Sequence, residues 1–342
     1  MNICFIMYPW EQADDRDSTV KMVHEAALRK HTVAITTPGA LTIRNSVTSA
    51  FCQVVIKADK VASKTSAFFK KVRFRDQLLP LAGFDIIFMR ANPPIDNIAL
   101  NFLDSVRNDV FIVNDIQGLR EANNKLYTAA FDDPNNEIIP VTHVSKNKTY
   151  LKKVIQESKS ERMIMKPLNG MGGSGVIVIE KNATQNINSL LDFYIAGKDG
   201  EKSYVIIQEF VEGAEQGDVR VLMLNGKPMG AFRRVPAKDD IRSNLSAGGR
   251  MEKHHLTRQE KKVCEIIGPK LVADGLYFVG LDIINGKLIE VNVCSPGGVV
   301  AISNLNRTNI AAKILDFAEG VVVNKEEALK RKAMFRQTVD NA

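Results

Sequence analysis

Two carboxylates and an amide oxygen lie close together in the stretch GLDIINGKLIEVNVC, at Asp282, Glu290 and Asn292. The stretch has the central Asn-Gly of a β-hairpin, and Glu290 and Asn292 leave the same face of one strand. Carboxylate and amide oxygens are ligands suited to Mg²⁺. Solvated carboxylates on an exposed face are the simpler interpretation. The neighbours are apolar, however, and buried carboxylates are costly unless they are paired or bound to metal, so we expect a metal site.

A glycine-rich loop is the second feature that could do chemistry. The stretch MKPLNGMGGSGVIVI places Lys166 at the end of one predicted strand and leads through four glycines into another strand. It is neither a P-loop, because no GK[ST] follows, nor a dinucleotide fingerprint, because no helix follows. Glycine N–H groups can approach phosphate oxygens closely, and Lys166 adds a charge. On the loop alone, a plain hairpin with a mobile tip is an equally good interpretation.

Arginines form the third group of candidate residues. Arg220 lies between apolar residues in DVRVL, Arg233 and Arg234 lie in FRRVP, and Arg242 lies in DIRSNLSAGG. Guanidinium groups suit carboxylate and phosphate partners. Surface charge is the alternative, but a solvated role is less natural for Arg220 among its apolar neighbours.

The first elements that must position these residues alternate between strand and helix. Strands are predicted over 2–8 and 31–39, a helix over 19–31, and further buried strands over 83–90 and 111–115. The order strand, helix, strand begins a parallel α/β sheet. We therefore expect an open α/β domain of about 120 residues, within the usual size of a domain.

From residue 123 onwards helices and strands mix, and strands later dominate. Helices are predicted over 124–131, 149–160, 258–275 and 309–321, with a charged helical tail after them, and residues 186–203 are predicted to be a helix followed by an exposed loop. Strands are predicted over 138–144, 162–168, 176–180, 204–211, 218–226, 227–235, 277–284 and 287–294. Asn-Gly pairs at 225–226 and 285–286 predict tight hairpins, and a loop rich in charge and glycine is predicted over 236–250.

Composition limits the classes of protein that remain. The 342 residues, 45% hydrophobic and 25% charged, suit a protein of several ordinary globular domains. We expect a cytoplasmic protein, because no apolar run could span a bilayer, no secretory signal opens the chain, and its cysteines form no CxxC pair. The net charge of +7 raises the question of whether the protein binds nucleic acid. No RNP, zinc-finger or KH pattern is present, so neither a nucleic-acid nor a membrane partner is expected.

Taken together, these stretches resemble the ATP-grasp fold, because they occur in the order that this fold uses. The motifs that carry the resemblance are NNKLYT, MKPLNGMGG, QEFV, GDVRVL, RSNLSAGG, GLDII and IEVNVCSP. More narrowly, MRANPP, IVNDIQGLREANNKL and the Asp-Ser-Thr at 17–19 resemble the bacterial glutathione synthetase family. The resemblance runs from residue 1 to about residue 320.

The resemblance implies an α/β and α+β architecture, an ATP-grasp fold with an N-terminal α/β (pre-ATP-grasp) domain. The implied activity is an ATP-dependent carboxylate–amine ligase that joins γ-glutamylcysteine and glycine to glutathione through an acyl phosphate. The implied parts are an N-terminal substrate domain over 1–122, a central small domain with a glycine-rich lid over 123–202, a C-terminal domain with the metal site over 203–320, and a charged helical tail over 321–342. Resembling enzymes are commonly homotetramers, which implies a homo-oligomer.

The resemblance also assigns roles to individual residues. The implied ATP-binding residues are Lys125, Lys166, Gly170, Met171, Gly172, Gly173, Gln208, Glu209, Phe210, Val211 and Asp218. The implied ligands of two Mg²⁺ ions, with Mn²⁺ as an alternative metal, are Asp282, Glu290 and Asn292. The implied catalytic residues are Arg220, Arg234, Arg242 and Asn244. The implied substrate-binding residues are Asp17, Ser18, Arg90, Ser295, Pro296 and Gly297.

Two stretches depart from the family pattern. After VNVCSP the family usually reaches an arginine, whereas this chain reads Gly-Gly-Val-Val over 297–300. Either Asn304, Arg307 or a neighbouring loop compensates for that arginine, or the substrate is different. The loop PWEQADDRD, which should border the peptide site, is also unlike the usual family loop.

Three alternatives to glutathione synthesis stay open at this point. One is another ATP-grasp ligase that uses a different γ-glutamyl or peptide acid, or a different amine acceptor. Another is a nucleotide-binding protein without turnover, which the presence of both lysines, the three candidate metal ligands and Arg220 disfavours. Nucleic-acid binding is the weakest.

Overall fold

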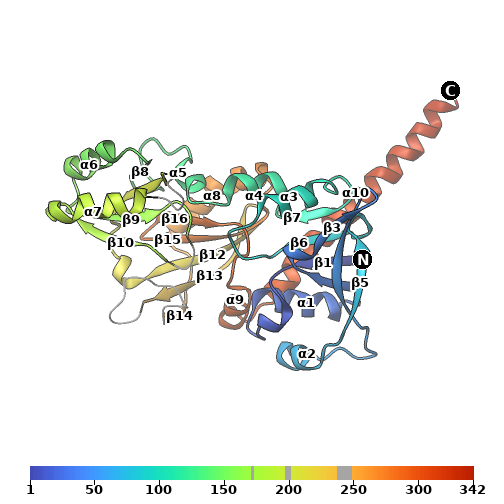
Figure 1. The fold of residues 1–342 in the computed structure, drawn as a ribbon. Coiled ribbons are helices and arrows are strands. Elements are labelled where there is room, and N and C mark those ends of the chain that lie inside the picture. Colours follow the sequence, from blue (N-terminus) through green and yellow to red (C-terminus); the bar gives the residue numbers. More distant parts are fainter. Residues whose placement is uncertain (171–172, 197–201, 237–248) are drawn as a thin grey trace. The chain divides into compact units, whose positions relative to one another are not determined.

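The structure is a computed structural model, and it describes all residues except 171–172, 197–201 and 237–248 (Figure 1). The chain forms two compact units. Unit 1 comprises Met1–Arg120, Asp274–Phe278 and Cys294–Ala342, and unit 2 comprises Glu121–Ala273 and Val279–Val293. The expected division into four parts, at 122, 202 and 320, stays a prediction.

Unit 1 is built around one mixed sheet with helices from both ends of the chain. Its strands are β1 (Asn2–Ile6), β2 (Thr32–Thr36), β3 (Leu41–Arg44), β4 (Val47–Val55), β5 (Phe74–Pro80), β6 (Ile86–Met89) and β7 (Phe111–Val113). Its helices are α1 (Ser18–Leu28), α2 (Thr65–Lys71), α3 (Asn97–Asp104), α9 (Val299–Asn306) and α10 (Ile310–Asp340), and α4 (Ile116–Ala122) leads into unit 2.

The parallel part of this sheet confirms the α/β interpretation. β1 pairs in parallel with β2 and with β6, and β6 pairs in parallel with β7. These strands are buried almost throughout, as short continuous apolar runs predict for a parallel sheet. The observed strands are shorter than the predicted runs, because the last residues of each run begin the loops that carry polar side chains.

An antiparallel extension of the same sheet was not predicted. The sheet order is β3-β4-β2-β1-β6-β7, and β5 pairs with β4. β3 and β4 are joined by Asn45 and Ser46, both with positive φ, which is the backbone of a tight hairpin without the usual glycine. The sequence of this hairpin therefore lacks the glycine signal that would have marked it.

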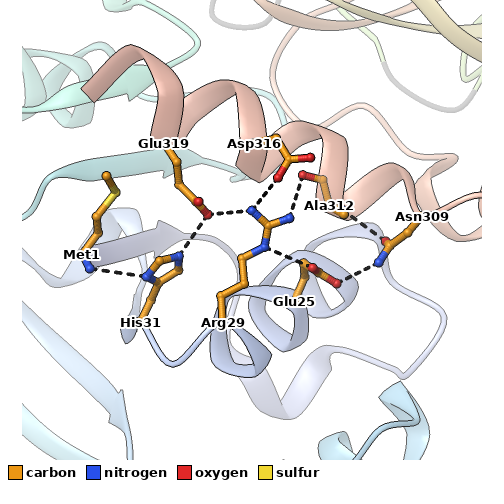
Figure 2. A network of polar contacts seen from close by, with 8 residues as sticks. All are labelled: Met1, Glu25, Arg29, His31, Asn309, Ala312, Asp316 and Glu319. Atoms are coloured by element: carbon orange, nitrogen blue, oxygen red, sulfur yellow. Dashed lines mark hydrogen bonds and ion pairs between the residues drawn. The ribbon is translucent and has the colours of Figure 1, made fainter. Parts of the chain in front are cut away.

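Helix α10 joins the predicted last helix and the charged tail into one continuous helix of 31 residues. Its first half is attached to α1 by a polar network (Figure 2). Arg29 contacts Glu25, Asp316 and Glu319 at 3.1, 2.7 and 2.9 Å, and His31 Nε2 lies 3.0 Å from Glu319. The C-terminal helix is thereby tied to the first strand–helix–strand of the chain.

The described residues of unit 2 form two sheets. The order of the first is β10-β9-β11-β8, and the order of the second is β14-β13-β12-β15-β16. Its strands are β8 (Thr142–Ser145), β9 (Arg162–Pro167), β10 (Ile177–Glu180), β11 (Val205–Glu209), β12 (Asp218–Leu224), β13 (Lys227–Val235), β14 (Arg250–Lys253), β15 (Phe278–Ile284, from the unit boundary) and β16 (Lys287–Asn292). Its helices are α5 (Leu126–Ala129), α6 (Lys148–Glu157), α7 (Thr184–Ile195) and α8 (Arg258–Ala273).

The predicted hairpins of unit 2 are confirmed. β12 and β13 pair antiparallel across Asn225-Gly226, and β15 and β16 pair antiparallel across Asn285-Gly286. All four turn residues have positive φ, from 44° to 74°, as a type I′ turn requires. The turns fix the register of both hairpins, and through the register they decide which side chains meet.

Helices α6 and α7 supply the apolar cover of the first sheet of unit 2. A buried cluster combines Leu151 and Ile155 of α6 with Leu191 of α7 and with Met163 and Met165 of β9. The amphipathic pattern over 149–160 predicted this face of α6. Over the described ranges, no helix in either unit is both long and apolar enough to cross a membrane.

Candidate active site

The hairpin β15–β16 brings the candidate metal ligands together within unit 2. Asp282 is the register partner of Glu290, and Asn292 is the register partner of Gly280. Asn292 Nδ2 lies 3.1 Å from Asp282 Oδ2. The two carboxylates and the amide therefore lie on one face of the hairpin, as the sequence pattern predicts.

Arginines from the neighbouring strand β12 and from the next strand, β13, contact Asp282. Arg220 of β12 donates from Nε to Asp282 Oδ1 at 2.5 Å and from Nη2 to Oδ2 at 3.0 Å. Arg234 Nη2 of β13 lies 2.9 Å from Asp282 Oδ2. The predicted side chains Arg220, Arg234 and Asp282 thus form one buried charged cluster.

Asp218 extends this cluster at the other end of Arg234. Arg234 donates from Nε and Nη2 to the two carboxylate oxygens of Asp218, at 2.6 and 2.8 Å. Both groups are buried, and they are register partners on β12 and β13. A bidentate pair of this kind holds Arg234 in one orientation toward Asp282.

The surrounding charges determine the protonation of Asp282. Burial alone would raise the pKa of this carboxyl group, but the guanidinium groups of Arg220 and Arg234 hold the pKa well below its usual range. Burial likewise lowers the pKa of Arg234, and Asp282 and Asp218 more than restore it. Asp282 is therefore a carboxylate at neutral pH.

The residues of this hairpin fit a divalent cation by the chemistry of their donors. Asp282 is ionised, and Glu290 and Asn292 add a second carboxylate and an amide oxygen, which are hard-oxygen ligands. Within the part of the chain that the structure describes, no cluster of three or more His, Cys, Asp or Glu side chains could hold a metal. A site here would therefore depend on the amide of Asn292 and on oxygens of the substrate.

Two lysines lie close to the same face of unit 2. Lys125 Nζ lies 3.2 Å from Glu290 Oε1 and donates to the carbonyl of Gly170 at 2.6 Å. Lys166 of β9 is buried and donates to Gln208 Oε1 at 3.0 Å. Burial lowers the pKa of Lys166 to about 8, with Lys125 adding to the effect and Glu290 opposing it. Lys166 therefore lies close enough to Lys125 and Glu290 for their charges to affect its pKa.

The glycine-rich loop connects two antiparallel neighbours. Ile177 of β10 pairs with Met165 of β9, so the loop after Pro167 is the tip of a hairpin. Gly173 has a φ of 76°, which favours glycine. Gly170 and Gly173 are described, whereas Met171 and Gly172, two of the four expected phosphate-contacting residues, lie outside the described residues.

The segment expected to line adenine, Gln208–Val211, spans the end of β11. Gln208 and Glu209 end this strand, and Gln208 donates to Thr142 Oγ1 at 2.8 Å as well as accepting from Lys166. Phe210 and Val211 are buried, and the guanidinium of Arg162 lies 4.0 Å from the centre of the Phe210 ring. Gln208 therefore ties the lysine end of β9 to this segment.

The predicted substrate-binding residues gather in unit 1. Asp17, Ser18, Arg90, Ser295 and Gly297 all line one polar pocket of about 490 Å³. Pro296 contributes its carbonyl, which accepts from Arg90 Nη2 at 3.1 Å. Five of the six predicted residues thus line a pocket and the sixth supports it.

Sequence reasoning did not name the other residues that line this pocket. They are Tyr8, Gln12, Asp14, Arg16, Thr19, Asn92 and Gly298. A signal was available, because most of them belong to the unusual loop PWEQADDRD or to the MRANPP motif. Their proximity depends on β1 and β6 being parallel neighbours, which single residues do not reveal.

The stretch that lacks the expected arginine borders the same pocket. Gly297 and Gly298 line it, and Gly298, with a φ of 118°, precedes helix α9. Asn304 and Arg307 are not among the lining residues, whereas Arg16 of the neighbouring loop is. Among the described residues that line the pocket, Arg16 is therefore the cation besides Arg90. Arg242 and Asn244, two of the expected catalytic residues, lie outside the described residues.

Comparisons with known proteins agree with this arrangement. Residues 1–120 match the N-terminal domain of prokaryotic glutathione synthetase, and residues 124–307 match its ATP-grasp domain. The glutathione synthetase of Gloeobacter violaceus is 32% identical over 93% of this chain and 96% of its own length. That of Synechocystis is 33% identical over 93% of this chain and 99% of its own length.

A solved structure agrees at the level of the fold. The "RimK domain protein ATP-grasp" from Sphaerobacter thermophilus superposes with a TM-score of 0.58 at 14% identity, over 93% of this chain and 99% of that chain. At this identity the likeness concerns the fold alone, and it confirms the expected ATP-grasp architecture with an N-terminal domain. With both domain matches and these relatives, the chain belongs to the prokaryotic glutathione synthetase family of ATP-grasp ligases.

Proposed function

We propose that this chain joins γ-glutamylcysteine and glycine to form glutathione, with ATP converted to ADP and phosphate. The observation that carries the proposal is the buried cluster of Asp282, Arg220 and Arg234 beside Glu290 and Lys125, in a chain of this family. The family membership makes the chain an ATP-dependent ligase. The cluster supplies the fixed charges that phosphoryl transfer requires.

The proposed reaction has two steps. A carboxylate oxygen of γ-glutamylcysteine attacks the γ-phosphorus of ATP, the bond from that phosphorus to ADP breaks, and an acyl phosphate forms. The neutral amine of glycine then attacks the acyl carbon, the bond to phosphate breaks, and the nitrogen loses a proton. Phosphate is a far better leaving group than oxide, so no nucleophile from the protein is needed.

We assign the ATP half of the reaction to unit 2. Lys125 and Lys166 contact the phosphates of ATP, with Gly170, Met171, Gly172 and Gly173 as the covering loop. The segment Gln208–Val211 lines the adenine. Arg220, Arg234, Arg242 and Asn244 stabilise the charge on the transferring phosphoryl group. The support for these roles is the proximity of the described residues around Asp282 and Glu290.

Asp282, Glu290 and Asn292 are the residues that would hold divalent metal, which we propose to be two Mg²⁺ ions. Bound metal would neutralise the charge of the phosphates. Arg220 and Arg234 keep Asp282 ionised and oriented. We propose Asp218 as the ribose contact, although its carboxylate also accepts two hydrogen bonds from Arg234.

Asp17, Ser18, Arg90, Ser295, Pro296 and Gly297 are the proposed contacts of the peptide acid, supported by the pocket that they form in unit 1. We also propose that the enzyme acts in the cytoplasm as a homo-oligomer, a tetramer by analogy with its family. The four cysteines are buried and in no disulfide, which suits a reducing compartment.

The proposal is tested by identifying the product and not only ADP. The purified chain is incubated with ATP, Mg²⁺ and γ-glutamylcysteine, with and without glycine, and the mixture is analysed for glutathione by mass spectrometry. We expect one glutathione per ADP, and only with glycine. A panel of other amines and γ-glutamyl acids serves as the control. Efficient turnover with another pair, and none with this one, would contradict the proposal and point to residues 297–300.

A further inference from the structure

One face of the first sheet of unit 2 carries three polar side chains on neighbouring strands. Strand β11 lies between β8 and β9, and its residue Gln208 is the register partner of Thr142 on β8. Lys166 of β9 pairs with Ile206, so Lys166 and Gln208 are diagonal neighbours on the same face. Ile207 points to the other face, where it belongs to the cluster covered by α6 and α7. The three polar side chains therefore lie on the face opposite these helices.

The hydroxyl group of Thr142 accepts a hydrogen bond from Gln208. It donates its single hydrogen to the carbonyl of Pro140 at 2.6 Å, so its lone pairs are left for Gln208 Nε2, which lies 2.8 Å away. With its nitrogen directed to β8, the amide of Gln208 presents Oε1 to Lys166 Nζ at 3.0 Å. A reversed amide would direct N–H groups at the ammonium group, which has no lone pair to accept them. Thr142 therefore fixes which end of the amide faces Lys166.

Burial makes this chain of hydrogen bonds important for the lysine. Gln208 and Lys166 are each only 5% exposed. A buried ammonium group is costly unless it is hydrogen-bonded, and a buried amide N–H without an acceptor is costly as well. Without the hydroxyl of Thr142, we expect Gln208 to rotate toward another acceptor, and its oxygen would then leave Lys166.

The contact with Gln208 leaves Lys166 able to bind phosphate. An ammonium group has three N–H donors, and Gln208 occupies one of them, so the contact does not exclude phosphate oxygens. A lysine side chain that is already held in place loses less conformational entropy when it binds a ligand. Orientation of Lys166 by Gln208 should therefore strengthen the binding of a nucleotide through its phosphates.

We propose that Thr142 is a positioning residue for the ATP site, which acts through the side chain of Gln208 to hold the ammonium group of Lys166 for the phosphates of ATP. The side chain of Gln208 then serves the lysine, and contacts to adenine are left to its backbone and to residues 209–211. This inference rests on the proposed function, because that proposal assigns Lys166 to the phosphates. It adds that the phosphate end of ATP, and not the base, depends on Thr142.

The test separates the phosphates from the base. Dissociation constants of ATP with Mg²⁺, and of adenosine, which has no phosphate, are measured by calorimetry for the unmodified protein and for variants. Thr142→Val keeps the shape of the side chain and removes the hydroxyl group. It should weaken ATP binding by about fivefold, the usual effect of losing one hydrogen bond. Adenosine binding should change by less than about twofold.

Conservative and matched variants identify the hydroxyl group as the cause. Thr142→Ser retains a hydroxyl group and should restore ATP affinity to within about twofold of the unmodified protein. Thr149→Val makes the same change at an exposed position of α6 and should leave both dissociation constants unchanged. Gln208→Met removes the link itself, so it should have the same pattern as Thr142→Val, and it serves if that variant does not fold.

A double-mutant cycle with Lys166→Met assigns the effect to the lysine. In the Lys166→Met background, Thr142→Val should change ATP affinity by less than about twofold, because the group that Thr142 positions is absent. An undiminished loss of affinity in that background would overturn the inference. Equal weakening of ATP and adenosine binding by Thr142→Val would overturn it as well.

The same variants separate this inference from the proposed function. Unchanged ATP affinity in Lys166→Met would contradict the proposed role of Lys166 and the inference with it. A clear loss in Lys166→Met, with none in Thr142→Val or Gln208→Met, would overturn the inference alone. The expected binding pattern in a protein that forms no glutathione would support the inference and contradict the proposed reaction.

Discussion

Lys166 is buried, and its charge determines the pH range over which it can bind the phosphates of ATP. Its pKa is lowered to about 8, chiefly by burial, so the lysine is charged at neutral pH and neutral in more alkaline solution. We therefore expect ATP affinity to fall as the pH rises through about 8, by up to about tenfold per pH unit. Calorimetric titration of ATP from pH 6.5 to about pH 9.5 measures this.

Lys166→Arg is the matched variant for this prediction, because arginine stays charged over the whole range. Its ATP affinity should be nearly independent of pH. An unmodified protein with constant affinity across this range, or an arginine variant with the same decline, would mean that the Lys166 charge is not used in ATP binding.

Replacing Glu290 tests one of the three proposed metal ligands. Glu290→Ala removes a carboxylate that is half-buried and lies beside Lys125, so the fold should tolerate the change. Turnover should fall by at least about 100-fold, the usual effect of losing one transition-state stabiliser. Steady-state assays over a range of Mg²⁺ concentrations, with thermal unfolding as the control for folding, measure it. Activity close to that of the unmodified enzyme would reject Glu290 as a ligand.

Asp218 carries a prediction about stability. Replacing it with alanine leaves the buried guanidinium of Arg234 with Asp282 alone, so the free energy of unfolding should fall by about 3–5 kcal/mol. Asp192→Ala, which removes the exposed partner of Lys148, is the matched control and should cost at most about 1 kcal/mol. Urea unfolding compares the two variants. Similar losses of unfolding free energy would show that the buried pair contributes no more to stability than the exposed pair.

At the scale of single residues, the sequence predicted much of the candidate site. Spacing alone placed Glu290 and Asn292 on one face, and the Asn-Gly turn placed Asp282 opposite them. The partners of Asp282 could not be predicted, because Arg220 and Arg234 reach it only through the strand order β13-β12-β15. Sheet order depends on long-range pairing that residue spacing does not record.

At the scale of elements, helices α1 and α2 are joined by a buried histidine. His24 Nε2 donates to the carbonyl of Ala62 at 2.6 Å, and in the neutral ring Nδ1 then accepts from the hydroxyl of Thr65 at 3.0 Å. His24 is fully buried and stacks on Phe68 of α2. The neutral ring can make both hydrogen bonds, and burial favours this form because it lowers the pKa of His24.

The lowered pKa makes the stability of unit 1 depend on pH. Below a pH of about 6.5 the unfolded chain binds a proton at His24 that the folded chain does not, so stability falls on acidification. The slope from this group should be positive with rising pH and at most about 1.4 kcal/mol per pH unit, the limit for one proton. His24→Gln should remove this component, and His255→Gln, at an exposed position, should not. Chemical unfolding between pH 5 and about pH 7.5 measures the slopes, and identical slopes would contradict the assignment.

The elements themselves were predicted unevenly. Apolar runs and Asn-Gly pairs identified the parallel strands of unit 1 and the hairpins of unit 2, because burial and turn chemistry leave local signals. Strands β3 to β5 were missed, since their turn uses Asn45 and Ser46 and they carry exposed apolar residues such as Phe51. Helix α9 was missed because its eight residues are too few for a clear helical period.

At the scale of the whole molecule, unit 1 is formed from both ends of the chain. The sequence suggested an N-terminal domain ending near residue 122, but Asp274–Phe278 and Cys294–Ala342 also belong to this compact unit. Asn114 shows the reason, since its side chain exchanges hydrogen bonds with the backbone of Phe278 at 2.7 and 2.8 Å. Contacts between residues so far apart in the sequence leave no pattern in the residues that separate them.

The fate of one oxygen atom tests the account as a whole most directly. γ-Glutamylcysteine labelled with ¹⁸O in its cysteinyl carboxylate is incubated with the enzyme, ATP, Mg²⁺ and glycine, and the released phosphate is analysed by mass spectrometry. If the carboxylate attacks the γ-phosphorus and glycine then displaces phosphate, each phosphate formed with glutathione carries one labelled oxygen. Unlabelled phosphate would mean that the labelled carboxylate never bonded to phosphorus, and it would contradict the acyl-phosphate ligase proposed for this chain.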